Sequence, residues 1–132
     1  MKEAPDTPVD IRIECQVHHS EDPSKVVRAV KNVINNCSPE PLNGRIQVLS
    51  KNLAFLDIIY EQIRSRRVMG VFRKALLNNM TGNSTWFYLN KQAAYVGIVS
   101  ICEEESESPL GPIKVTLRSS DLESVINWLI EL

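Results

Sequence analysis

The stretch GNSTWFYLNKQAAYVGIVSICEEESESPLGPI, residues 82–113, contains the patterns that decide the fold. Turn-forming residues fill 78–85, and the aromatic run after them predicts a strand over 86–89. Residues 90–94 are predicted to form a helical turn or a bulge, and 95–102 a further strand. An acidic loop with Glu103, Glu104, Glu105 and Glu107 then precedes a strand over 113–118. Three closely spaced strands favour an antiparallel arrangement over alternation of strands and helices.

The sequence before this stretch supplies two more strands and most of the helices. Residues 9–17 alternate between apolar and polar side chains, which predicts a half-buried strand. The other predicted elements are a helix from residue 23 to near 37, a strand over 45–49, helical stretches over 53–63 and 68–77 with a possible kink near 70, and a last helix from residue 122. This order predicts an α+β fold with a mostly antiparallel sheet and helices packed on one face.

The chain of 132 residues fits one domain with one core. We expect a flexible tail over 1–8 and a single α+β domain over 9–132. No apolar run approaches the roughly 18 residues of a membrane span, and the polar N-terminus does not resemble a secretory signal. A cytoplasmic location without membrane association is therefore expected.

The cysteines and histidines do not have the spacing of a metal site. Cys15, Cys37 and Cys102 are scattered, and Cys15 and Cys102 occupy apolar strand positions, which predicts buried thiols. His18 and His19 follow the first strand, where adjacent side chains are expected to point to opposite faces. We therefore expect no metal and no cofactor. No catalytic triad, carboxylate pair or activated Cys–His couple is found either, so no enzyme is expected.

The basic residues gather in one segment, although the net charge is −1. RNA-binding domains usually carry a basic excess, because contacts with phosphate supply much of their affinity. In RSRRVMGVFRKALL, residues 64–77, helical spacing places four cations opposite the apolar stripe. These candidates for RNA or anion binding are Arg66, Arg67, Arg73 and Lys74. A solvated helix face and a membrane-surface helix are the alternatives.

A second set of candidates lies on the 82–113 stretch itself. Amide, hydroxyl and amino groups here can contact phosphate, sugar or base edges, or they can close turns through their own backbone. They are Asn83, Ser84, Thr85, Asn90, Lys91 and Gln92. Trp86 and Tyr88 share one strand face, where they can stack on bases if that face is open or pack beneath a helix or a partner subunit. The acidic loop is interpreted as a solvated loop, with a cation site as the alternative.

Four segments together identify a resemblance that covers nearly the whole chain. They are VDIRIECQVHHSEDPSKVVRAVKNV (9–33), RSRRVMGVFRKALL (64–77), GNSTWFYLNKQAAYVGIVS (82–100) and SPLGPIKVTL (108–117). The chain resembles an archaeal family of uncharacterised proteins, number two hundred and one in the uncharacterised-protein-family series. The resemblance implies an α+β fold similar to RNA-binding ribosomal protein L-five, an archaeal cytoplasmic setting and a homodimer. It implies no catalytic residues.

Two functional hypotheses follow. The first is a non-enzymatic, dimeric interaction protein with an RNA-binding-like fold, which the slightly negative net charge favours. Strands that carry Trp86, Tyr88 and Tyr95 also have surplus aromatic surface that a second subunit can cover. The alternative is an RNA-associated protein that contacts the RNA backbone weakly through the basic helix, which the segregated cations favour.

Overall fold

The computed structural model describes residues 4–131, in which six strands form one sheet in the order β2-β3-β1-β6-β4-β5. The strands are β1 (Asp10–Gln16), β2 (Pro41–Leu42), β3 (Arg45–Ser50), β4 (Ser84–Leu89), β5 (Ile101–Cys102) and β6 (Ile113–Arg118). The helices are α1 (Pro23–Val33), α2 (Asp57–Ser65), α3 (Met69–Asn78), α4 (Lys91–Tyr95) and α5 (Leu122–Ile130), with short 3-10 helices η1 (Leu53–Leu56) and η2 (Glu105–Glu107). Every strand pairs antiparallel with its neighbours, which confirms the predicted α+β fold.

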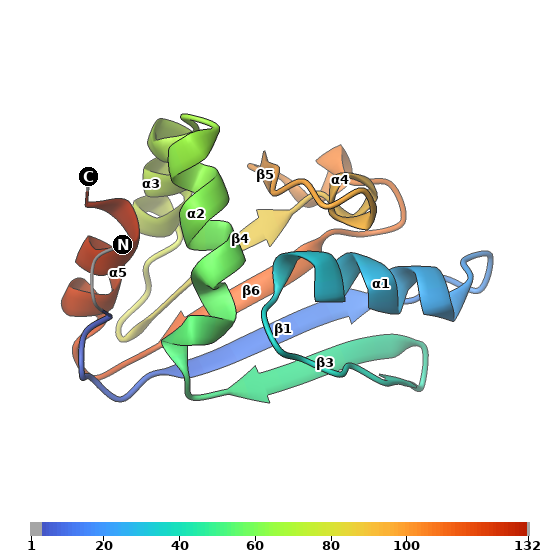
Figure 1. The fold of residues 1–132 in the computed structure, drawn as a ribbon, viewed down its shortest axis with the longest axis horizontal. Helices are drawn as coiled ribbons and strands as arrows, with labels where there is room; N and C mark the ends of the chain where they lie inside the picture. The colour runs from blue at the N-terminus through green and yellow to red at the C-terminus, as the bar shows by residue number, and fades with distance from the viewer. Residues whose placement is uncertain (1–3, 132) are drawn as a thin grey trace.

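Period-two patterning determines which face of the sheet is buried. In the central strands β1, β6 and β4, alternate residues such as Ile13, Val115 and Phe87 are fully buried. Figure 1 shows the helices on one side of this sheet, so these side chains form the core between sheet and helices. The intervening residues lie on the other face, which no helix covers. The prediction of helices on one face is confirmed.

Local signals in the sequence explain how the helices begin and pack. Asp22 caps α1 by accepting a hydrogen bond from the Ser24 amide at 3.0 Å, and Pro23 starts the helix. The Phe72 ring of α3 meets Phe87 of β4 edge-on, with centroids 4.9 Å apart. Trp128 of α5 stacks on Tyr60 of α2 at 4.7 Å. Aromatic contacts of this kind bind the helical layer together and to the sheet.

The strand predicted over 95–102 is wrong for most of its length. Asn90 caps α4 by accepting from the Ala93 amide at 2.8 Å, so the helical turn extends through Tyr95, and only Ile101–Cys102 pairs as β5. The segment between α4 and β5 needs no strand partner, because the Gln62 side chain of α2 bonds to its backbone. This side chain donates to the Gly97 carbonyl and accepts from the Val99 amide, both at 2.8 Å, which satisfies the local backbone.

The N-terminal segment is only partly described. Residues 1–3 of the expected tail over 1–8 lie outside the described residues, and 4–8 form neither helix nor strand. Pro8 is nevertheless fixed, because its carbonyl accepts a hydrogen bond from the Ser119 hydroxyl at 2.7 Å. Within 4–131, no helix has both the length and the apolar character that crossing a membrane requires.

Candidate functional site

The helix-free face of the sheet is the candidate site, and we call it the open face. Its side chains come from alternate positions of four strands, and all of them are exposed or half-buried. Pairing between strands aligns them in three rows across the sheet. The rows are Asp10–Arg118–Ser84, then Leu49–Arg12–Thr116–Trp86, then Gln47–Glu14–Lys114–Tyr88.

Two aromatic rings lie together on β4. The centroids of Trp86 and Tyr88 are 4.7 Å apart with a tilt of 53°, and the Lys114 ammonium lies 5.0 Å from the centre of the Trp86 ring. Partial burial, and after it the nearby Glu105 carboxylate, raise the pKa of the Tyr88 hydroxyl. Neither aromatic is covered by a helix, so the interpretation that they pack beneath one is wrong.

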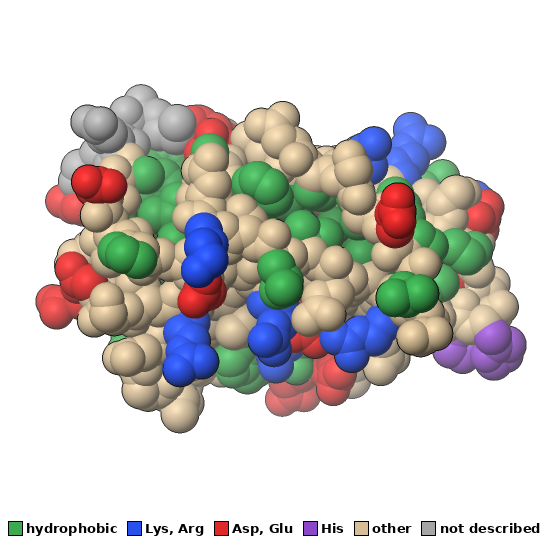
Figure 2. Space-filling view, turned by 90° about the horizontal axis from the view of Figure 1, so that it is seen from below, with side chains coloured by type: hydrophobic (Ala, Val, Ile, Leu, Met, Phe, Trp, Pro, Cys, Tyr) green, Lys and Arg blue, Asp and Glu red, His purple; other side chains and the backbone are tan. Residues whose placement is uncertain are grey.

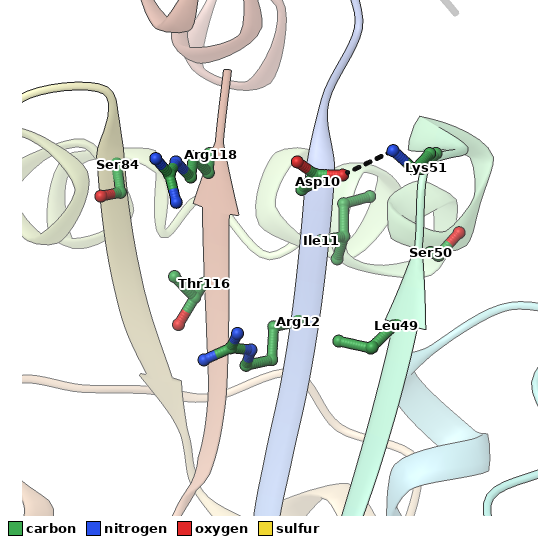
Figure 3. Close-up of a pocket in the computed structure, with 9 residues that line it drawn as sticks. All are labelled: Asp10, Ile11, Arg12, Leu49, Ser50, Lys51, Ser84, Thr116 and Arg118. Carbon is green, nitrogen blue, oxygen red and sulfur yellow. Dashed lines mark ion pairs between the residues drawn. The ribbon is translucent and has the colours of Figure 1, made fainter. Parts of the chain in front are cut away.

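A basic cavity of about 580 Å³ lies at the other end of the open face. Its charged lining residues are Asp10, Arg12, Lys51 and Arg118. Figure 3 shows the Arg12 and Arg118 guanidinium groups on either side of Thr116, with Arg118 directed toward Ser84. Asp10 pairs with Lys51 at 3.2 Å, whereas Arg118 forms no ion pair with any described residue. The cavity therefore presents uncompensated positive charge.

The charge of the open face differs in sign from that of the whole chain. Five cations line it or its rim, against the carboxylates of Asp10, Glu14 and Glu105, although the chain carries −1 overall. The cations are Arg12, Arg45, Lys51, Lys114 and Arg118. Figure 2, which views the molecule from the β3 edge of the sheet, shows a band of Lys and Arg side chains with some Asp and Glu among them. The negative net charge therefore does not describe this surface.

The predicted basic helix does not exist as one element. Helix α2 ends at Ser65, Arg66 caps it, and Arg67 adopts a left-handed conformation with φ of 57° before α3 begins. Arg66 and Arg67 therefore lie in a turn, while Arg73 and Lys74 lie on α3. Lys74 also pairs with Glu103 of the acidic loop at 3.4 Å. The four cations do not share one helix face, because the left-handed residue Arg67 ends the helical path before α3 begins.

Most of the polar residues on the 82–113 stretch serve the structure locally. The buried Thr85 hydroxyl donates to the Leu76 carbonyl at 2.6 Å, and the Asn83 carbonyl accepts from the Ser119 amide at 3.0 Å. Asn90 caps α4, and Gln92 donates to the Pro109 carbonyl at 2.8 Å. Ser84 is the member of this set that faces the open side of the sheet.

Lys91 lies almost fully buried behind the sheet edge. Its ammonium pairs with Glu21 at 3.0 Å and donates to the carbonyls of Gln16 and Leu110, both at 2.9 Å. These bonds join the end of β1, the turn before α1 and the loop before β6. The amino group is thus occupied by partners within the chain.

The cysteines are buried as predicted, and no metal site appears among the described residues. Burial raises the pKa of the Cys15 thiol to about 11, and it also raises the pKa values of Cys37 and Cys102. The prediction that His18 and His19 point to opposite faces is wrong, because β1 ends at Gln16 and their rings lie 4.1 Å apart. Within 4–131, no group of three or more His, Cys, Asp or Glu side chains can hold a metal ion.

The cations of the open face were not among the residues selected from the sequence. Three of these cations occupy polar positions in strands of alternating pattern, where solvated side chains are expected: Arg12, Lys114 and Arg118. Their grouping depends on β1 lying beside β6, which strand patterning alone does not specify. The signal available in the sequence was that three separate strands carry basic residues on their polar sides.

Comparisons with known proteins relate the chain to a family model and to curated relatives that share one family name. A family model described as RNA binding matches residues 10–119. The UPF0201 protein of Sulfurisphaera tokodaii is 41% identical over 123 residues, which cover 90% of this chain and 85% of that protein. The UPF0201 protein of Methanothermobacter thermautotrophicus is 36% identical over 119 residues, covering 90% and 89%.

Solved structures agree with the sequence relatives. The crystal structure of the UPF0201 protein from Methanococcus jannaschii matches with a TM-score of 0.75 at 27% identity, covering 93% of each chain. Another crystal structure of an uncharacterized UPF0201 protein gives 0.72 at 30% identity, covering 85% of this chain and 84% of that one. The chain, which matches a family model described as RNA binding, therefore belongs to the archaeal UPF0201 family.

Proposed function

We propose that this protein binds RNA through the open face of its sheet. The observation that carries the proposal is that cations and accessible aromatic rings occur together on one helix-free surface, and that Arg118 and Lys114 among these cations form no ion pair with a described residue. The description of the matching family model supports RNA as the ligand. The proposed role is binding, as that description names it.

The two kinds of side chain supply complementary contacts. Arg12, Arg45, Lys114 and Arg118 can neutralise phosphates, which provides affinity that does not depend on sequence. Trp86 and Tyr88 can stack on bases, a contact worth about 1 to 3 kcal/mol per base in proteins that bind single strands. Sheet surfaces with exposed aromatics bind unstacked bases in other RNA-binding modules. Because base faces are hidden in a duplex, the open face favours single-stranded RNA.

The basic segment that the sequence first indicated is the competing RNA site. A matched comparison separates the two, because each surface offers three arginines. One variant combines Arg12→Gln, Arg45→Gln and Arg118→Gln on the open face, and the other combines Arg66→Gln, Arg67→Gln and Arg73→Gln near α3. Both change the net charge equally, so they differ only in the position of the lost charge.

Fluorescence anisotropy with a labelled oligouridine strand at several salt concentrations measures the outcome. We expect the open-face variant to lose most of its affinity and to reduce the magnitude of the log–log salt slope by about 2, as three lost phosphate contacts on a single strand imply. The variant near α3 should bind almost as the parent does. The reverse pattern would place RNA on the basic turn and α3, and an absence of RNA binding by the parent protein would refute the proposed function.

We also infer a homodimer, which concerns the β3 edge of the sheet and shares Leu49 with the open face. On the outer side of β3, only Arg45 and Ile46 pair with β2, so the rest of that edge carries unpaired backbone groups. Leu42 and Leu49 beside this edge are 72% and 68% exposed. Open apolar edges readily pair with another chain. We infer that two copies associate here, which leaves the aromatic part of the open face free for RNA.

Sedimentation velocity tests this assembly. The parent protein is expected to sediment at twice its chain mass of 14.9 kDa, and a variant with Leu42→Gln and Leu49→Gln as a monomer. Because both side chains are exposed, circular dichroism should show an unchanged fold. A parent protein that sediments only as a single chain at micromolar concentration rules out the homodimer.

A further inference from the structure

The cavity at the Arg118 end of the open face has the composition of a phosphate site. We propose that Arg118 and Arg12 together bind one phosphate group of an RNA strand, while Trp86 in the adjacent row stacks on the neighbouring base. This inference rests on the proposed RNA-binding function and deepens it, because it assigns a position to one phosphate. The cavity volume of about 580 Å³ lies within the usual range for small-molecule sites.

The two arginines are available for an anion. Arg118 is exposed and forms no ion pair within the described part of the chain. The nearest carboxylate oxygen to Arg12 belongs to Glu14 at 3.8 Å, which is too long for a hydrogen bond. Both guanidinium groups can therefore present their paired N–H donors to phosphate oxygens. The Asp10 carboxylate also lines the cavity, but it is paired with Lys51 at 3.2 Å.

Hydroxyl groups complete the site. The Thr116 hydroxyl lies between the two arginines in Figure 3 and makes no hydrogen bond to another described residue. The Ser84 hydroxyl donates to the Thr81 carbonyl at 3.3 Å and keeps its oxygen lone pairs free to accept. Thr116 can donate to a phosphate oxygen, and Ser84 can accept from a ribose hydroxyl. These groups offer the chemistry of a ribonucleotide rather than that of a bare anion.

Strand pairing places the aromatic ring one row from the phosphate position. Ser84 is opposite Arg118, and Trp86 is opposite Thr116. Alternate residues of a strand are about 6.7 Å apart, so one nucleotide can contact both rows. At the other end of the face, Glu105 lies beside Tyr88 and Lys114 in a second, smaller hollow. That carboxylate opposes phosphate binding there, so the arginine end is the anchored one.

A double-mutant cycle between one arginine and one phosphate tests the inference. The protein variants are Arg118→Gln and, as the matched control on the same face, Arg45→Gln, which lies outside the cavity. The ligands are short oligouridine strands in which single phosphates are replaced by neutral methylphosphonates, one position at a time. A second series carries or lacks a terminal phosphate, which distinguishes an end group from an internal phosphate.

We expect Arg118→Gln to weaken binding of the unmodified strand about tenfold, the loss typical of a charge-assisted hydrogen-bond pair. Neutralising one particular phosphate should weaken binding to the parent and to Arg45→Gln, but it should have little further effect on Arg118→Gln. If the sensitive position is the terminal phosphate, the site binds a strand end; if it is internal, the site binds the backbone.

A uniform response overturns the phosphate site without affecting the proposed function. In that case every methylphosphonate would weaken the parent and both variants equally, although the combined open-face variant still loses RNA. If the combined variant keeps its affinity, the proposed function itself fails. Arg118→Lys adds a check on geometry: it should recover only part of the lost affinity, because an ammonium group cannot form the two-pronged contact.

Discussion

Individual residues show why side-chain chemistry alone did not locate the site. Lys91 is a cationic residue in a polar run, yet its ammonium lies buried among Glu21 and two backbone carbonyls. Arg118 looks like an ordinary strand-end residue, yet it has no ion-pair partner among the described residues and lines the basic cavity. A residue's neighbours in space decide whether its charge stabilises the fold or is available to a ligand. Those neighbours come from distant parts of the sequence.

The buried Lys91–Glu21 pair should contribute strongly to stability. Lys91→Met removes the charge but keeps most of the side-chain volume, and it leaves the 12% exposed Glu21 carboxylate without its partner. We expect the free energy of unfolding in urea to fall by about 3 kcal/mol. Lys74→Met is the control, because the Lys74–Glu103 pair is solvent-exposed and its loss should cost about 0.5 kcal/mol. Equal effects of the two substitutions would contradict the structural role of Lys91.

The buried Cys15 thiol should make stability decrease at high pH. Its pKa rises from 9.0 to about 11, chiefly through burial, so the folded state keeps the thiol proton at a pH where the unfolded state releases it. Fewer bound protons in the unfolded state mean that the free energy of unfolding falls as pH rises between 9 and 11. In urea titrations, Cys15→Ala should show a smaller fall across this range than the parent. Identical pH profiles would show that the thiol ionises similarly in both states.

At the scale of elements, sequence patterns predicted what depends on local chemistry. The alternation in β1 and β6 and the cap at Asp22 are local features, and the structure has them where expected. The strand predicted over 95–102 failed because the Gln62 side chain, more than 30 residues away, satisfies the backbone there. The open face was not predicted because it depends on which strands lie side by side. The prediction of one basic helix over 64–77 is wrong because Arg67 adopts a left-handed conformation.

That left-handed residue, Arg67, gives a prediction about the turn between α2 and α3. Its φ of 57° is unfavourable for a residue with a Cβ atom, whereas glycine adopts it readily. Arg67→Gly should therefore leave the unfolding free energy unchanged or raise it by up to about 1 kcal/mol. Arg66→Gly is the control, because Arg66 has φ of −92° and gains no relief. It should lower stability by about 0.5 to 1 kcal/mol. Equal losses for both would show that α2 and α3 are not separated by this turn.

For the whole molecule, the distribution of charge is more informative than its total. A net charge of −1 is unfavourable for RNA, but the charge is unevenly distributed: four of the 16 acidic residues lie in the loop over 103–107, and five cations line the open face or its rim. Composition indicates only the sum, so it favoured an interaction protein. The predicted similarity to ribosomal protein L-five stays a prediction. Membership of the UPF0201 family agrees with the resemblance seen in the sequence.

The most direct test of RNA binding at the open face uses the two tryptophans of the chain. Trp86 lies half-buried on that face, whereas Trp128 is buried against Tyr60 on the helical side and serves as an internal control. Fluorine NMR of fluorotryptophan-labelled protein gives one signal for each, assigned with Trp86→Phe and Trp128→Phe. On titration with single-stranded oligouridine, the Trp86 signal should shift progressively while the Trp128 signal stays in place. An unmoved Trp86 signal under conditions where anisotropy shows bound RNA would contradict the account.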